Sequence, residues 1–199
     1  MRPEGAWAKV NQVLQPAMNE MFFAQRLVLV EGWEDVAYIH AWMSLTDRWH
    51  SFRARGVHIV PVQAKHALLQ PLLIAKGLEI PVFTIYDSDT GTNRPDEHLR
   101  DNTALLRVLG GNEGDPFPTE PVWEESYVAW SGNMGDTVRA EIDAEAWAQA
   151  GNHASAQCGM AKDLTKNTLH IGARLAWLWD NGHKPESLDR LCDVIVNFG

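Results

Sequence analysis

The feature that most constrains the fold is a repeated alternation of short apolar runs with helical segments. The runs 27–30, 57–62 and 81–86 are rich in β-branched residues, as is typical of strands buried on both faces of a sheet. Segments with helical periodicity, 35–45 and 65–75, separate them. Strands that alternate with helices predict an α/β fold, in which helices cover both faces of a parallel sheet.

The remainder of the chain is predominantly helical in pattern. A fourth strand is predicted at 126–130, and helices are predicted at 7–24, 96–109, 137–150, 164–179 and 188–196. We therefore predict a sheet domain with its N-terminal helix over 1–134, and a small C-terminal helical subdomain over 135–199.

Composition and charge exclude several classes of protein. The net charge of −9 argues against a surface that is uniformly basic and wrapped in nucleic acid. No apolar run approaches the roughly 20 residues of a membrane helix, and the first residues lack the pattern of a signal peptide. The two cysteines, Cys158 and Cys192, form no CxxC pair, which disfavours disulfide frameworks and cysteine-rich zinc sites. These features predict a cytoplasmic protein that does not associate with membranes.

Acidic residues gather at the ends of two predicted strands. Glu31 closes the first run, Asp35 follows about one helical turn later, and Asp87 and Asp89 end the third run. Ligand sites in parallel sheets form at the carboxyl ends of the strands, and carboxylate oxygens suit Mg²⁺ or Mn²⁺. Two such ions about 4 Å apart can activate a water and stabilise the leaving oxygen of a phosphodiester. The sequence thus predicts a site for two ions of Mg²⁺ or Mn²⁺.

Simpler interpretations of the same carboxylates stay open. Asp35 can interact with the dipole at the start of its helix, and Asp87 and Asp89 can be ordinary loop residues. A regulatory α/β module that binds one Mg²⁺ without hydrolysing anything is the alternative function.

The strands and their acidic ends resemble a known family. The stretches LVLVEGWEDVAYI and VHIVPVQAKHALLQPLLIAKGLEIPVFTIYDSD, preceded by FFAQR, resemble the Toprim domain of OLD-family nucleases (overcoming lysogenization defect). Toprim motifs are a Glu-Gly after the first strand and an Asp-x-Asp after the third, here Glu31-Gly32 and Asp87-Ser88-Asp89. The resemblance covers about residues 22–90. It implies a Rossmann-like Toprim sheet and a hydrolase, a metal-dependent DNA endonuclease that nicks and cuts double strands.

The resemblance also implies partners. OLD proteins join an ABC-type ATPase to a C-terminal Toprim nuclease, and this chain has no GxxxxGK[ST] phosphate loop. We therefore expect the nuclease portion, with DNA as substrate and an ABC-type ATPase region in the same protein or complex. A homo-oligomer is compatible with this expectation. The wider Toprim set includes primases and topoisomerases, which stay as alternatives.

Further site residues follow from the resemblance alone. It implies an additional metal ligand in the C-terminal part, for which Asp136 is the best match and Ser131 and Glu124 are weaker ones. It also implies a lysine near the scissile phosphate, matched by Lys166 within TKNTLHIGARLAWLWDNGHKPESL. Glu31 and Lys166 are then the expected catalytic residues.

Two other lysines and one histidine are candidates near the site. Lys65 opens a predicted helix, whose amino terminus can hold phosphate, and a solvated surface lysine is the alternative. Lys162 shares a predicted helical face with Lys166, which suits nucleic-acid binding or a plain amphipathic rim. The eight histidines show no metal-ligand spacing, and only His66 is expected near the site.

Overall fold

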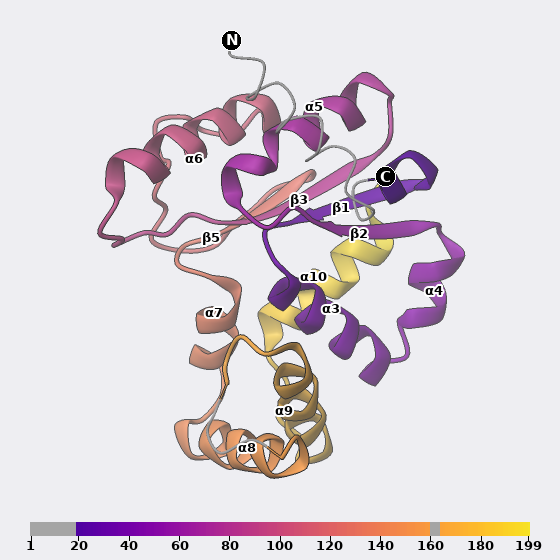
Figure 1. Ribbon diagram of the computed structural model, residues 1–199, viewed down its shortest axis with the longest axis vertical. Helices are drawn as coiled ribbons and strands as arrows, with labels where there is room; N and C mark the ends of the chain where they lie inside the picture. Colours follow the sequence, from indigo (N-terminus) through magenta and orange to yellow (C-terminus); the bar gives the residue numbers. More distant parts are fainter. Residues whose placement is uncertain (1–18, 160–163) are drawn as a thin grey trace.

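The computed structural model describes residues 19–159 and 164–199, and a mostly parallel sheet lies at its centre (Figure 1). The strand order is β2-β1-β3-β5-β4. Strands β1 (Arg26–Val30), β2 (Val57–Pro61), β3 (Val82–Asp87) and β5 (Tyr127–Trp130) are parallel, and β4 (Val122–Trp123) runs antiparallel to β5. The predicted parallel α/β sheet is therefore confirmed. Strand β4 was not predicted, because two residues are too few to show a periodic pattern.

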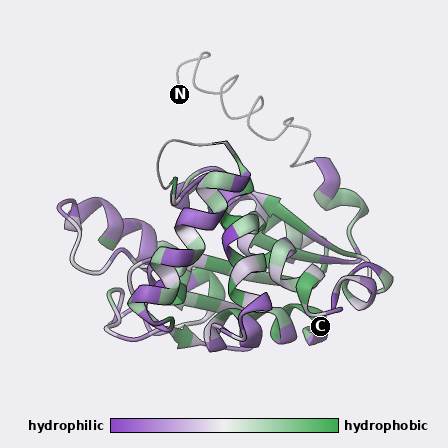
Figure 2. Cartoon of the chain, turned by 90° about the horizontal axis from the view of Figure 1, so that it is seen from below, coloured by the Kyte–Doolittle hydropathy of each residue, from purple (hydrophilic) through white to green (hydrophobic). Residues whose placement is uncertain are grey.

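Helices cover both faces of this sheet (Figure 1). Side chains alternate along β1, so that Val28 and Val30 join one hydrophobic core and Leu27 and Leu29 join the other. Figure 2 shows largely hydrophobic strands beside helices in which hydrophobic and hydrophilic residues alternate. The elements in chain order around the strands are η1 (Glu20–Phe23), α3 (Trp33–Leu45), α4 (Trp49–Ala54), η2 (Lys65–Ala67), α5 (Leu69–Gly77), α6 (Pro95–Leu109), α7 (Met134–Ala140), α8 (Ala144–Gln157), α9 (Thr168–Asp180) and α10 (Glu186–Asn197).

The C-terminal helices pack on the α3 side of the sheet. Ile171 of α9 and Leu191 of α10 belong to the same hydrophobic core as Val28 and Phe83 of the sheet. Arg48 reinforces this packing through ion pairs with Asp189 at 2.8 Å and Asp193 at 2.7 Å. The boundary predicted between residues 134 and 135 falls at the start of α7, and the division into two domains stays a prediction.

Two helix predictions need correction. The single helix predicted at 137–150 is wrong, because α7 ends at Ala140 and the Asp143 carboxylate caps α8 by accepting from Glu145 N at 2.9 Å. The helix predicted at 164–179 begins only at Thr168, where the Asn167 side chain accepts from Leu169 N at 3.0 Å. Most of the helix predicted at 7–24 lies outside the described residues, and α4 was not predicted. Among the described residues, no helix has both the length and the apolar character of a membrane span.

Candidate active site

The ends of β1 and β3 bring Glu31 and Asp87 together. The two strands are neighbours in the sheet, and Glu31 Oε1 accepts a hydrogen bond from Asp87 N at 2.8 Å. Burial raises the pKa of Glu31 to about 7, and the charges of Asp35 and Asp89 also raise it. Burial and then the Glu31 charge hold the pKa of Asp87 well above its usual range. The predicted carboxylates therefore lie close enough to repel one another.

Asp35 lies in the first turn of α3, at the same edge of the sheet. It is buried, and its carboxylate accepts from Gly32 N at 2.9 Å, so it caps the helix as the simpler interpretation requires. Burial raises its pKa to about 6. Asp35 also lines a cavity together with Asp87, so the capping role does not remove it from the site.

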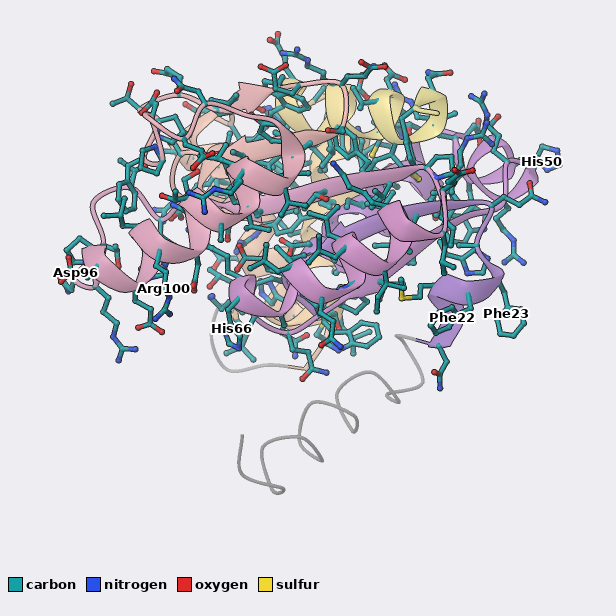
Figure 3. The ribbon with its side chains drawn as sticks, turned by 90° about the horizontal axis from the view of Figure 1, so that it is seen from above. Phe22, Phe23, His50, His66, Asp96 and Arg100 are labelled. Carbon is teal, nitrogen blue, oxygen red and sulfur yellow. The ribbon has the colours of Figure 1, made fainter. Side chains whose placement is uncertain are left out.

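Asp89 is paired with two nitrogen atoms of the protein. Its Oδ2 lies 2.6 Å from Lys65 Nζ and 2.9 Å from His98 Nδ1. Lys65 is only 6% exposed, so it is not a solvated surface lysine, and its predicted contact with nucleic acid stays a prediction. His98 comes from α6 and was not a candidate in the sequence analysis, whereas the exposed His66 lies on the outside of the molecule (Figure 3).

The oxygen donors of these carboxylates are of the type that binds a divalent cation. Their present orientation, however, does not converge on one point. Among residues 19–159 and 164–199, no three His, Cys, Asp or Glu side chains are already placed to hold a metal ion. Glu31 is turned to Asp87 N, Asp35 to Gly32 N, and Asp89 to Lys65. These hard oxygen donors nevertheless raise one another's pKa, and a divalent ion would compensate their mutual repulsion.

A cavity of about 210 Å³ lies against two of the carboxylates. Asp35 and Asp87 line it from the sheet side, Asp136 and Arg139 line it from α7, and Lys166 lines it from the turn before α9. Asp136 and Lys166, which were expected from the family resemblance, thus line the same cavity as Asp35 and Asp87. Its placement of Lys166 on a helix is wrong, because Lys166 precedes the cap residue Asn167.

The polar groups around this cavity differ in their partners. Lys166 Nζ donates to Glu34 Oε1 at 3.3 Å and is 83% exposed in its side chain. The Asp136 carboxylate accepts from Asn133 Nδ2 at 2.7 Å. The Arg139 guanidinium has no hydrogen bond or ion pair with any residue in the described part of the chain. Neither Glu34 nor Arg139 was a sequence candidate, since each is an ordinary charged residue on a helix.

The remaining candidates lie elsewhere. Ser131 follows β5 at the same sheet edge, where its backbone oxygen accepts from Thr90 N at 2.8 Å, but it does not line the cavity. Glu124 pairs with Tyr127 at the start of β5, which is the opposite end of the parallel strands from Asp87, so this weak candidate is wrong. Lys162 lies outside the described residues.

Comparison with known proteins supports the assignment of the first part of the chain. Residues 22–89 match the family model described as "Overcoming lysogenization defect protein-like, TOPRIM domain". No curated protein sequence matches the chain. The matched segment begins just before β1 and ends at Asp89, so it includes both acidic motifs.

The chain also matches solved structures from two bacteria. The C-terminal region of the Xanthomonas campestris pv. campestris OLD protein, phased with iodine, has a TM-score of 0.49 and 15% identity, over 88% of this chain and 95% of that chain. The C-terminal region of the Burkholderia pseudomallei OLD protein has a TM-score of 0.45 and 16% identity, over 87% and 98% of the two chains. The family model, rather than these distant likenesses, identifies residues 22–89 as an OLD-like Toprim domain.

Proposed function

We propose that this chain is a metal-dependent endonuclease that hydrolyses DNA phosphodiesters. The observation that carries the proposal is the cavity, which combines the acidic residues Asp35 and Asp87 with the cationic residues Lys166 and Arg139. A phosphodiester needs both kinds of group, since cations stabilise its negative charge and carboxylates hold the ions that activate water. Toprim domains in general bind divalent metal ions, which agrees with this donor set.

In this proposal the carboxylates hold the metal ions. Glu31, Asp35 and Asp87 would be the principal ligands, Asp89 would bind a second ion, and Asp136 would contribute a further carboxylate. When bound, two ions of Mg²⁺ or Mn²⁺ supply an activated water and stabilise the leaving oxygen. Glu31 would have the further role of a base that accepts a proton from the attacking water.

The cations at the cavity serve the nucleic acid. Lys166 stabilises the charge that develops on the scissile phosphate, and Arg139 holds a phosphate of the same strand. Both side chains are exposed, so an incoming backbone can reach them. We further propose that the chain works with an ABC-type ATPase region, forms a homo-oligomer, and is located in the cytoplasm.

Cleavage of supercoiled plasmid tests the proposal. The chain is incubated with plasmid in Mg²⁺, Mn²⁺, Ca²⁺ or EDTA, beside Asp87→Asn and the matched control Asp115→Asn, which changes an exposed loop carboxylate. We expect nicked and linear product with Mg²⁺ or Mn²⁺ for the wild type and the control only. No cleavage in any metal would contradict the proposal, and metal binding without cleavage would favour the regulatory module.

A further inference from the structure

The cluster of strand-end carboxylates has two different sides. On the Asp89 side, but not on the Asp35 side, a buried cation among the described residues lies against the carboxylate. Lys65 lies in η2, directly after β2, and its ammonium is 2.6 Å from Asp89 Oδ2. His98 Nδ1 lies 2.9 Å from the same oxygen and 3.3 Å from Lys65 Nζ. Three separate parts of the chain therefore meet at one carboxylate oxygen.

The burial of Lys65 makes this contact strong. Its side chain is 6% exposed, and a buried ammonium is unfavourable unless a carboxylate compensates it. The Lys65 charge also acts beyond Asp89, on Glu31 and Asp87, which end the neighbouring strands β1 and β3. Lys65 is thus a fixed positive charge beside the cluster of carboxylates.

On the Asp35 side, no buried lysine or arginine of the described residues forms an ion pair with the carboxylate. Asp35 accepts a hydrogen bond from the backbone N–H of Gly32, and Lys166, which lines the same cavity, has an exposed ammonium that pairs with Glu34. A divalent ion on this side meets carboxylates without displacing a buried charge. On the other side it must compete with Lys65 for the oxygen of Asp89.

We propose that Lys65 is a built-in cation of this site, so that one divalent ion binds tightly on the Asp35 and Asp87 side and a second binds well only after Lys65 releases Asp89. Lys65 is then a positioning residue, and His98 helps it to hold Asp89. This inference rests on the proposed function, because it concerns the same metal site.

Titration with Mn²⁺ in the absence of DNA tests the inference, with free Mn²⁺ followed by electron paramagnetic resonance. We expect the wild type to bind one Mn²⁺ tightly and a second at least about tenfold more weakly. In Lys65→Met, which keeps the length of the side chain and removes its charge, we expect the second dissociation constant to fall by about tenfold or more. Lys65→Arg restores a cation and should restore the wild-type pattern.

Matched variants separate the effect of the Lys65 charge from a general loss of structure. Lys76→Met changes an exposed lysine of α5 and should leave both dissociation constants unchanged. If Lys65→Met fails to fold, two other variants still decide the question, because they test where the tight ion lies. Asp35→Asn should weaken the tight ion by about tenfold, whereas Asp89→Asn should change it by less than about threefold.

The outcomes distinguish this inference from the proposed function. Suppose that Asp35→Asn abolishes tight Mn²⁺ binding, but that wild type and Lys65→Met bind Mn²⁺ with the same stoichiometry and affinities. This result overturns the role of Lys65 as a built-in cation and leaves the nuclease proposal intact. A tight ion that Asp89→Asn removes also overturns it. Absence of Mn²⁺ binding in the wild type contradicts the proposed function itself.

Discussion

Glu31 and Asp87 are 56 residues apart in the sequence, and a 2.8 Å hydrogen bond from the Asp87 backbone N–H to Glu31 Oε1 joins the ends of β1 and β3. The bond lowers the pKa of Glu31, while burial raises it more strongly, to about 7. A carboxylate in this position is held by the backbone and remains poorly solvated, as a metal ligand at a functional site is expected to be.

Glu31→Gln tests the catalytic assignment with little change in shape. The amide oxygen of glutamine can still accept from Asp87 N, so we expect an unchanged fold by circular dichroism. Cleavage should fall by about 100-fold or more, because an amide is a poor Mg²⁺ ligand and no base. The matched control is Glu124→Gln, at the opposite end of the strands, which should cleave as the wild type does. Wild-type cleavage by Glu31→Gln would remove this residue from the mechanism.

The raised pKa values predict how stability depends on pH when EDTA removes divalent ions. The folded protein binds the Glu31 proton more tightly than the unfolded chain does, with a pKa of about 7 against 4.5. The free energy of unfolding should therefore fall as pH rises through this window. At pH 8, Glu31→Gln should raise Tm by on the order of 5 °C relative to wild type, and at pH 4 the two should agree.

Addition of Mn²⁺ at pH 8 provides the internal check of that prediction. The ion should raise Tm of the wild type, because it compensates the repulsion among the carboxylates, and it should raise Tm of Glu31→Gln much less. Parallel pH profiles for the two proteins in EDTA would show that Glu31 titrates normally.

The sheet and its acidic edge could be predicted from the sequence because their signals are local. A run such as Leu27–Val30 reports a buried strand by itself, and Glu31 and Asp87 follow directly from where such runs end. The break before α8 was missed for a physical reason: the Asp143 side chain competes with the helix for backbone N–H groups, whereas the apolar period continues across it.

The residues that surround the carboxylates depend on contacts that no local pattern reports. Lys65, Asp89 and His98 meet because η2, the loop after β3 and α6 converge. Nothing in the adjacent sequence distinguishes His98 from the exposed His66. Asp136 and Lys166 were reached through family resemblance rather than through periodicity. Arg139 carries no motif, and only the cavity identifies it.

Arg139→Ala tests whether the guanidinium at the cavity holds nucleic acid. In Ca²⁺, fluorescence anisotropy with labelled duplex DNA should show weaker binding for the variant. The slope of log affinity against log salt should decrease by about one, since one phosphate contact is lost. Arg53→Ala is the control, because Arg53 is exposed on α4, beyond the far end of α3. An unchanged salt slope in Arg139→Ala would argue against a phosphate contact.

Lys166→Ala tests the residue proposed to act on the scissile phosphate. Its ion pair with Glu34 is 3.3 Å long and largely exposed, so its loss should cost little stability. Four carboxylates and a phosphate leave excess negative charge even beside two divalent ions, so a nearby cation has a large effect on the transition state. We therefore expect cleavage to fall by about 100-fold or more, measured as initial rates on plasmid.

Metal affinity separates this role from that of a ligand or a merely structural residue. Lys166→Ala removes a positive neighbour of Asp35, so Mn²⁺ binding should stay unchanged or tighten slightly. Lys76→Ala, on the opposite side of the sheet, should leave both cleavage and metal binding unaltered. Cleavage near the wild-type rate in Lys166→Ala would assign this lysine to the surface alone, and Arg139 would then be the cation at the cavity that remains to act on the phosphate.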